Sequence, residues 1–419
     1  FAAARRDFGA AFGRAVGAQD TRARRLRTAL VVAEIALTVV LLAGAGLLLR
    51  SYAKVLAVDP GFDADHLLVV GTVLPPSRYP EPADRDAFYQ RVLERVRMLP
   101  GVESAGYVNF APLVVKGGRS ITLVEGRPRP APGEMARTVA SNRAVSPGYL
   151  EMLGVPLVSG RFVDARDTRS APGAAVINQT MAGIHWPDQD PLGQRFTMGA
   201  LDRMFTVVGV VGDIRQNGLD VPALPEVYVP LDQAAAPFLG PSNLVVRADG
   251  DPLALAAAVR AAVWEVDPNQ PVSDVRSMSQ VLDFELANRN TQLTLIGAFA
   301  VLALVLAGVG LYGVLSYTVS QRTNEIGLRM ALGAAERVVV GSVLRSALAT
   351  ALLGIGIGLV AAFALTRTIA SFLYQTSPTD PATAAAVAGV LLVIAGLAAF
   401  VPARRAASVN PMTALRAED

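Results

Sequence analysis

Few side chains in this sequence have the types and spacing that metal binding or covalent catalysis requires. Its only histidines, His66 and His185, lie far apart, and neither has a second histidine or a glutamate at ligand spacing. The absence of cysteine excludes a disulfide framework, a thiolate zinc site and a cysteine nucleophile. The Gly-x-Ser-x-Gly turn that presents a nucleophilic serine is also absent. We therefore predict no metal site and no catalytic residue in this chain, and we expect that it is not an enzyme.

The lysines exclude a further kind of chemistry, ATP hydrolysis by a P-loop. A P-loop needs Gly-Lys-Ser/Thr, because the lysine reaches the β and γ phosphates while the hydroxyl holds magnesium. Lys54 and Lys116 are the only lysines, and neither lies in such a sequence. We therefore expect no cofactor in this chain. The formal net charge of +3 is small, and we expect no nucleic-acid partner.

The segment 320–334, SQRTNEIGLRMALGA, is the best candidate for contact with a partner protein. Glu325 and Arg329 form an i, i+4 pair in the stabilising order, and Gly333 can end a helix, so we expect a short amphipathic helix. Its charged residues are Arg322, Glu325 and Arg329, and its apolar residues include Ile326, Met330 and Leu332. Two interpretations stay open on the residues alone: the helix docks on a partner, or it only reverses the chain at a membrane surface.

Long apolar segments flank this candidate helix. The chain has 419 residues, of which 52% are hydrophobic, and its mean hydropathy of +0.40 is typical of a membrane protein. A helix needs roughly 20 mostly apolar residues to cross the hydrocarbon core of a bilayer. We predict four transmembrane helices, at 28–49, about 292–316, 345–366 and 382–403.

Two features inside the predicted spans have both a functional and a structural interpretation. Glu34 is an acidic residue in the first span, where such residues take part in proton transfer, but it also lies near enough to a helix end to reach the headgroups or an arginine. Gly354 and Gly358 form a GxxxG pattern in the third span, which lets two helices approach closely. We expect these glycines to pack helices within the bundle.

Arginine placement predicts the orientation, because short cytoplasmic flanks retain positive charge. The segment 1–27, the loop between the second and third spans and the C-terminal tail are arginine-rich, so we expect all three to be cytoplasmic, with segment 1–27 partly at the membrane surface. The loop after the third span offers only Arg367 and is expected outside, together with residues 51–290. The supporting arginines are Arg22, Arg24, Arg25, Arg27, Arg322, Arg329, Arg337, Arg404, Arg405 and Arg416.

Residues 51–290 are expected to form an extracytoplasmic α+β domain. A strand, helix, strand pattern occurs once near its start and once near its end, which predicts a ferredoxin-like split β-α-β subdomain. The Gly- and Pro-rich region of about 120–240 is expected to form an inserted, mostly β subdomain. From Ser279 a helical pattern continues into the second span. The predicted strands are 67–73, 102–110, 243–247 and 272–276, and the predicted helices are 84–98 and 251–266.

Several motifs together resemble those of bacterial ABC permeases with an FtsX-like permease domain and a MacB-like periplasmic core domain. They are VVAEIALTVVLLAGAGLLLRS, DPGF, SQRTNEIGLRMALGA, TSPTDPAT and VPARRAASVNPMTALRAED. The resemblance covers nearly the whole chain, and its most specific parts are 320–334 and 401–416. VINQTMAGIHWPDQDPLGQRF, residues 176–196, is similar to the subgroup in which two permease halves are duplicated in one polypeptide. Phe1 would then lie in the link between the halves.

The resemblance implies a role for segment 320–334 as a coupling helix that docks on a separate cytoplasmic ABC ATPase, which would bind ATP and magnesium. It also implies a second permease half, supplied either by a homodimer or by a duplicated half, in the lipid of the bacterial inner membrane. Residues 291–419 would be the FtsX-like permease domain. The residues that match the coupling motif are Arg322, Glu325, Ile326, Gly327, Arg329, Met330, Leu332 and Gly333.

These observations favour a permease subunit or half of an ABC-type system, in which ATP hydrolysis moves the 51–290 domain for export or for mechanical transmission across the envelope. One alternative is a non-transporting member of the same architecture that regulates an envelope enzyme or another envelope partner. Another is a membrane sensor whose outer domain binds a ligand. The three spans that follow the outer domain and the absence of a cytoplasmic output domain from the sequence argue against the sensor.

Overall fold

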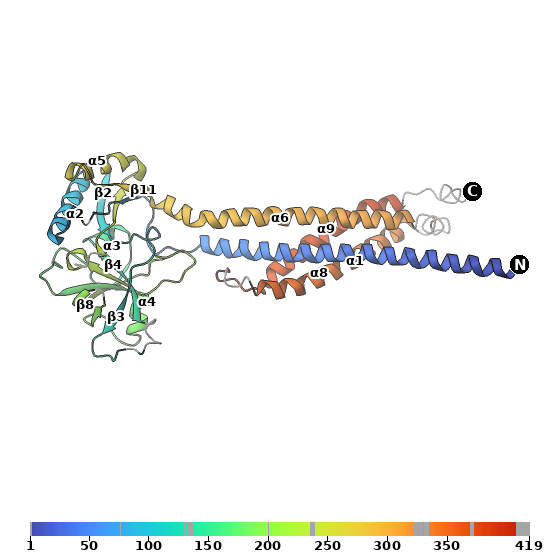
Figure 1. Ribbon diagram of the computed structural model, residues 1–419, viewed down its shortest axis with the longest axis horizontal. Helices are drawn as coiled ribbons and strands as arrows, with labels where there is room; N and C mark the ends of the chain where they lie inside the picture. The colour runs from blue at the N-terminus through green and yellow to red at the C-terminus, as the bar shows by residue number, and fades with distance from the viewer. Residues whose placement is uncertain are drawn as a thin grey trace. The chain divides into compact units, whose positions relative to one another are not determined.

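Two compact units make up the chain, the helical unit (Phe1–Leu56 with Arg289–Asp419) and the α+β unit (Ala57–Asn288) (Figure 1). The boundaries fall close to the expected ones at 51 and 290. The computed structural model describes residues 2–75, 77–129, 131, 138–199, 201–234, 239–321, 330, 335–368 and 373–407, and of residues 2–24, 202 and 288–290 it describes the backbone only.

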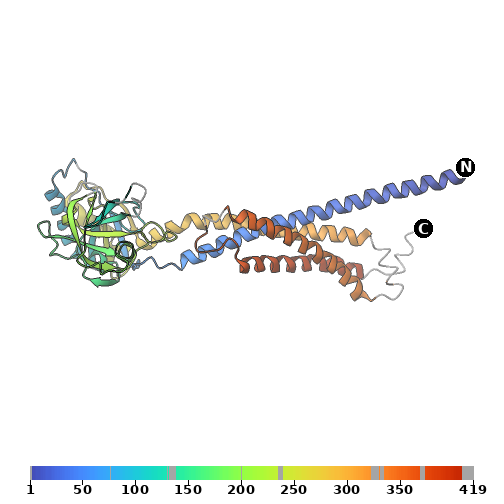
Figure 2. The same ribbon diagram turned by 90° about the horizontal axis from the view of Figure 1, so that it is seen from below.

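Four long helices, α1, α6, α8 and α9, supply the helical unit. Each predicted span lies inside one of them. Helix α8 packs along both α1 and α9 (Figure 2). The helices are α1 (Ala2–Leu56), α6 (Met278–Gln321), α8 (Glu336–Thr366) and α9 (Pro381–Ala407). The stretches of the described chain that are long and apolar enough to cross a membrane are Arg25–Leu56, Thr291–Gln321, Glu336–Thr366 and Pro381–Arg405.

The core of the helical unit is built from side chains that recur every four residues along each helix. This spacing places them on one face of a helix. Helix α9 illustrates it, with Val387, Leu391, Ala395 and Ala399 buried. The other buried members are Val31, Ile35 and Val39 of α1, Leu311 and Leu315 of α6, and Ala347, Ala351 and Ile355 of α8.

A four-stranded antiparallel sheet with two helices forms the first part of the α+β unit. The strand order is β11-β1-β10-β2, and the chain passes β1-α2-β2 and later β10-α5-β11, so the predicted split β-α-β subdomain is confirmed. A short turn of 3-10 helix, η4 (Pro252–Leu255), precedes α5. The bounds are β1 (Leu67–Gly71), α2 (Pro82–Arg97), β2 (Val102–Val108), β10 (Asn243–Ala248), α5 (Ala256–Val266) and β11 (Ser273–Ser277).

The segment between β2 and β10 forms a closed barrel, so the expectation of an inserted, mostly β subdomain is confirmed. Its ring runs β4-β3-β7-β8-β6-β9, and a parallel pairing of β4 with β9 closes it. The stacked rings of Phe196 and Phe205, with centroids 6.1 Å apart, help to fill the interior. The bounds are β3 (Arg119–Val124), β4 (Val139–Val145), α3 (Tyr149–Met152), β5 (Leu157–Gly160), β6 (Gly173–Asn178), α4 (Gln179–His185), β7 (Arg195–Met198), β8 (Leu201–Val211), β9 (Glu226–Pro230) and η2 (Leu231–Gln233).

A single apolar core joins the sheet to the barrel. Alternate residues of a strand point to opposite faces; accordingly Leu68 and Val70 of β1 pack toward α2 and α5, while Leu67 and Val69 enter this core. We call it the shared core. The strands of the barrel contribute Val145, Val176, Val211 and Tyr228, and the sheet also contributes Val108 and Val245.

Both chain connections of the α+β unit begin in the shared core. At the N-terminal side, Phe62 of the DPGF motif is buried in it. At the C-terminal side, Met278 and Val281 of the first turns of α6 are buried in it. Helix α6 continues from Met278 to Gln321, so the helix predicted to run from the outer domain into the second span is confirmed.

The DPGF motif holds the start of the α+β unit against the barrel. The carbonyl of Pro60 accepts a hydrogen bond of 2.9 Å from the backbone N–H of Arg215. Gly61 has φ +82°, and a Cβ at this position would collide with the carbonyl of Asp213. Glycine is therefore required here by both the backbone conformation and the close approach of a second chain segment.

A buried ion pair spans the strands that close the barrel. Arg143 of β4 and Glu226 of β9 have side chains only 1% and 2% exposed, and Nε lies 2.7 Å from Oε1. The hydroxyl of Tyr228 donates a 2.7 Å hydrogen bond to Glu226, and Arg143 donates one of 3.0 Å to the carbonyl of Gly117. Burial raises the pKa of Glu226, whereas the charge of Arg143 and the hydrogen bond from Tyr228 oppose that rise.

Replacing one partner of this pair tests how far the barrel depends on it. Arg143→Met leaves the Glu226 carboxylate buried without its counter-charge, so we expect the free energy of unfolding of the α+β unit to fall by about 3–5 kcal/mol. The double variant Arg143→Met/Glu226→Gln should recover part of this loss, because no unpaired charge remains. The measurement is urea unfolding followed by tryptophan fluorescence, since Trp186 and Trp264, the only tryptophans, both lie in this unit.

Arg195 provides the control, because its ion pair with Glu125 lies at the surface, with side chains 52% and 45% exposed. Arg195→Met should change the unfolding midpoint far less than Arg143→Met, since solvent screens such pairs. Equal effects of the two substitutions would contradict a special role for the buried pair.

Candidate functional site

The predicted coupling segment lies almost entirely outside the described residues. Within it the structure describes Ser320 and Gln321, which end α6, and Met330, which is helical and half-buried. The contacts of the other matched residues therefore stay predictions. The residues of this site that lie outside the described part of the chain are Arg322, Glu325, Ile326, Gly327, Arg329, Leu332 and Gly333.

The end of α6, where the coupling segment begins, is described, and aromatic side chains connect it to neighbouring helices. Helix α6 ends at Gln321, whose amide donates a 2.8 Å hydrogen bond to the hydroxyl of Tyr317. The guanidinium carbon of Arg27 on α1 lies 4.1 Å from the centre of the Tyr317 ring. Arg405 of α9 donates a 3.3 Å hydrogen bond to the hydroxyl of Tyr312. The end of α6 that leads into the coupling segment is thus held to both α1 and α9.

Gly354 and Gly358 lie where α8 packs against α1. A Cβ at Gly354 would lie 2.8 Å from Cβ of Ile35, and a Cβ at Gly358 would lie 2.6 Å from Cβ of Val39. These distances are shorter than van der Waals contact, so the two helices approach as closely as they do because both positions lack a side chain. The geometry places the GxxxG pattern in a helix contact within the chain.

Glu34 lies at a contact between α1 and α6. Its carboxylate lies beside Gly310, where a Cβ would overlap it. One turn further along α1, the hydroxyl of Thr38 donates 2.8 Å to the carbonyl of Glu34 and lies 3.4 Å from the carbonyl of Ala303 on α6. Glycine on α6 therefore makes room for the acidic side chain, which sits in a helix contact.

The histidines show no arrangement for metal binding in the part of the chain that the structure describes. His66 Nδ1 lies 2.7 Å from the carbonyl of Gly250. His185 is buried at the end of α4, where burial lowers its pKa. Within the described ranges no cluster of three or more histidine, aspartate or glutamate side chains could hold a metal ion.

Sequence reasoning assigned no role to a polar cluster at the opposite end of the spans. Asp380 caps α9: its carboxylate accepts hydrogen bonds of 2.9 and 2.7 Å from the backbone N–H and the hydroxyl of Thr383, and it forms an ion pair with Arg50 of α1. The Thr383 hydrogen bonds, followed by Arg50, hold the pKa of Asp380 below its ordinary value. The signal was present in the sequence, because aspartate before a proline, here Pro381, is typical of a helix start.

Comparison with known families gives two matches that together cover most of the chain. Residues 28–263 match the MacB-like periplasmic core domain, and residues 297–411 match the FtsX-like permease C-terminal domain. The first match alone covers more than half of the chain.

Individual relatives carry export permease names. A macrolide export ATP-binding/permease protein MacB of Azoarcus sp. is 29% identical over 383 residues, 88% of this chain and 55% of the relative. The protein of the same name from Marinobacter nauticus is 29% identical over 267 residues, 63% of this chain and 41% of the relative. The chain spans about half the length of these curated relatives. The solved periplasmic region of MacB from Actinobacillus actinomycetemcomitans is similar at 13% identity and TM-score 0.38, over 54% of this chain and 95% of that chain.

The glycine contact on α8 yields a prediction with a control on the same helix. Gly358→Ala places a methyl group against Val39 and the carbonyl of Ala36, which lies 2.8 Å from the new Cβ. We expect the free energy of unfolding of the helical unit to fall by about 1–3 kcal/mol, as for other overpacked sites. Unfolding of the purified chain in SDS titrations, followed by circular dichroism, measures it.

Gly356 is the matched control, because a Cβ there meets no atom within 4 Å. Gly356→Ala should leave the unfolding midpoint unchanged or raise it slightly, since alanine is favoured over glycine inside a helix by roughly 0.5–1 kcal/mol. A destabilisation of Gly356→Ala as large as that of Gly358→Ala would show that helix propensity, and not the contact with α1, decides the result.

Proposed function

We propose that this chain transmits ATP-driven motion to its α+β unit, for export or for mechanical work in the cell envelope. The chain belongs to the family of permeases with a MacB-like periplasmic core domain and an FtsX-like C-terminal domain. The family makes it an ABC-type permease with several membrane-spanning helices. In this proposal, the partners of the α+β unit determine what the chain exports or acts on.

ATP hydrolysis is assigned to a partner in this proposal. The names of the relatives combine ATP-binding and permease, whereas this sequence holds neither of its lysines in a Gly-Lys-Ser/Thr motif. We assign ATP and magnesium binding to a separate cytoplasmic ABC ATPase, and no cofactor to this chain. The ATPase would act on two permease halves, of which this chain supplies one.

Helix α6 is the observation that carries the proposal. Its first residue, Met278, is fully buried in the shared core of the α+β unit, and its last residue, Gln321, lies within the first two residues of the coupling segment 320–334. Backbone hydrogen bonds of a continuous helix resist stretching and bending, so a displacement of the coupling segment is passed along the helix rather than absorbed in a loop. The contacts of Tyr317 and Tyr312 extend the same displacement to α1 and α9.

The shared core bears on whether the α+β unit moves as one body or changes its internal arrangement. Phe62 at one connection and Met278 at the other are buried in the same core as side chains from both the sheet and the barrel. Closely packed cores transmit displacement because they deform little. We therefore propose that the unit moves as one body and does not open between its sheet and its barrel.

The orientation is part of the proposal and has its own test. The arginine-rich flanks support a cytoplasmic coupling segment and an α+β unit on the far side of the inner membrane. Single cysteines at Met98, which is 77% exposed, and at Gln375 should react with a membrane-impermeant maleimide in spheroplasts. A cysteine at Ala335 should react only after permeabilisation. The native chain has no cysteine to interfere, and labelling at Ala335 without labelling at Gln375 would reverse the orientation.

Met330 provides the test of ATPase coupling. If segment 320–334 enters a groove of the ATPase, its apolar side chains are buried there, and Met330→Glu forces an unpaired carboxylate into an apolar contact. We expect at least about tenfold weaker association with the ATPase, equivalent to roughly 1.4 kcal/mol, at an unchanged level of chain in the membrane. Copurification of the ATPase and stimulated ATP hydrolysis are the measurements.

Two matched variants separate the apolar contact from a general effect of charge. Ala335→Glu introduces the same group at an exposed position just outside the segment and should leave association nearly unchanged. Glu325→Ala should weaken association less than Met330→Glu, because charges at an interface rim contribute little. Undiminished copurification and ATP hydrolysis with Met330→Glu would show that the segment only reverses the chain at the membrane surface.

A further inference from the structure

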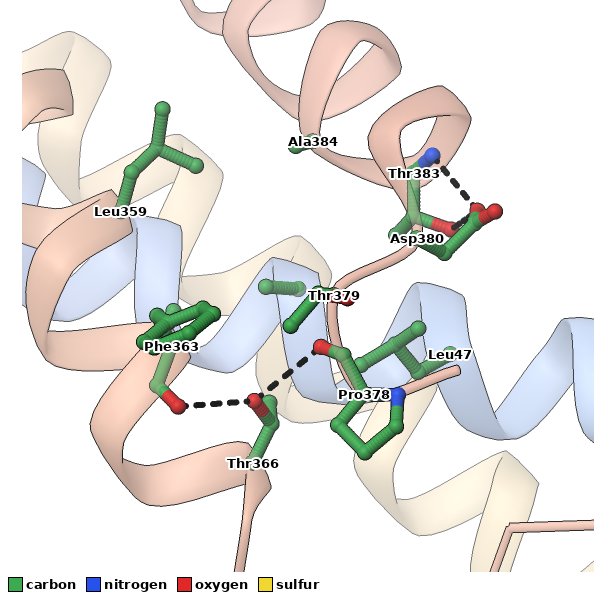
Figure 3. A pocket seen from close by; sticks show the side chains of 11 residues that line it. Leu47, Leu359, Phe363, Thr366, Pro378, Thr379, Asp380, Thr383 and Ala384 are labelled. Carbon is green, nitrogen blue, oxygen red and sulfur yellow. Dashed lines mark hydrogen bonds between the residues drawn. The ribbon is translucent and has the colours of Figure 1, made fainter. Parts of the chain in front are cut away.

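A cavity of about 210 Å³ lies between α1, α8 and the start of α9, within the helical unit (Figure 3). Leu47 reaches it from α1, Leu359 and Phe363 reach it from α8, and Pro378 and Thr379 close it from the loop before α9. The remaining lining residues are Ala43, Ala362, Thr366, Asp380, Thr383 and Ala384. The cavity is thus at the end of the spans where α8 ends and α9 begins.

The lining favours an apolar occupant, because its polar atoms already have partners in the protein. Thr383 donates to Asp380, and the hydroxyl of Thr366 donates 3.2 Å to the carbonyl of Pro378. The hydroxyl of Thr379 lies 2.9 Å from that of Ser377. What is left facing the cavity is mainly hydrocarbon, and a polar solute would lose its hydrogen bonds to water without replacing them.

The size of the cavity suits a flexible hydrocarbon chain. A dry apolar cavity of roughly 150 Å³ is already enough to bind benzene, so this one holds several methylene groups. It lies beside the outer turns of α8 and α9, which carry exposed apolar side chains such as Leu365 at 53% exposure. In a bilayer those turns are in contact with lipid, and acyl chains are the apolar molecules present there at the highest concentration.

The charges around the cavity favour an anionic headgroup. Arg367 lies at the end of α8, with its guanidinium carbon 4.5 Å from the centre of the Phe363 ring. Arg50 is held at Asp380 by an ion pair, and Lys54 donates to the carbonyl of Gln375. Among the described residues of the helical unit at this end, these three cations are accompanied by one carboxylate, that of Asp380, which pairs with Arg50. Guanidinium groups bind phosphate well because their planar N–H groups match its oxygens.

We propose that this cavity is a specific site for an anionic phospholipid. One acyl chain enters between Leu47, Leu359 and Phe363, and the phosphate lies against the guanidinium groups of Arg367 and Arg50. The bound lipid fills the space between α1, α8 and α9 where residues 373–380 lead into α9. The site does not depend on the ATPase or on the exported substrate, so it is tested separately from the proposed function.

Native mass spectrometry of the purified full-length chain tests the site. The chain is equilibrated with equal amounts of phosphatidylglycerol and phosphatidylethanolamine in detergent, and the lipid retained at increasing collision energy is counted. We expect one retained phosphatidylglycerol per chain. Ala384→Phe fills the cavity and should reduce its occupancy at least fivefold, whereas Ala385→Phe places the same ring at the exposed neighbouring position and should leave the occupancy unchanged.

A charge variant separates the headgroup contact from the acyl contact. Arg367→Gln should reduce the preference for phosphatidylglycerol over phosphatidylethanolamine at least threefold while one lipid is still retained. Arg337→Gln, at an exposed position near the other end of α8, should leave that preference intact. No retained lipid on the unaltered chain, or equal retention by Ala384→Phe and Ala385→Phe, would overturn the site. An unchanged preference in Arg367→Gln would overturn the anionic headgroup.

Discussion

The shared core between the four-stranded sheet and the barrel is the constraint on which the α+β unit depends. It is where the two subdomains meet, and it also holds Phe62 and Met278, which lie at the two connections to the rest of the chain. A core that served only stability would not need to include both connections. Because it does, neither connection can move without moving the packed side chains around it, and those belong to both the sheet and the barrel.

In the helical unit, the helices contact one another closely at small residues rather than through large side chains. Gly354 and Gly358 let α8 contact α1, and Gly310 lets the Glu34 side chain fit between α1 and α6. Alanine is frequent among the buried residues of α8 and α9. Small residues suit helices in lipid, where the hydrophobic effect does not drive helices together and dispersion contacts must do so instead. Larger interlocking side chains are used in the α+β unit, where water is the competing environment.

The two ends of the bundle have different chemistry. At the end of α6, arginine and tyrosine side chains connect α1, α6 and α9 next to the segment proposed to meet the ATPase. At the opposite end, Asp380 holds the start of α9 and pairs with Arg50 beside an apolar cavity. Under the proposed function α6 is the path of motion. By our inference, α1, α8, α9 and a bound lipid order the cavity end.

The sequence by itself determined the spans, the arginine pattern, the split β-α-β elements and the helix from Ser279 into the second span, because each depends on apolar periodicity or on charge within one segment. The same local reasoning could identify 320–334 as amphipathic but not what it touches. Only the tertiary structure decided that β4 pairs with β9 to close a barrel, with Arg143 and Glu226 buried across the pairing, since these residues are far apart in the chain. It also decided that Phe62 and Met278 enter one core and that Arg50 meets Asp380. Such contacts follow from how distant segments pack, which no local pattern contains.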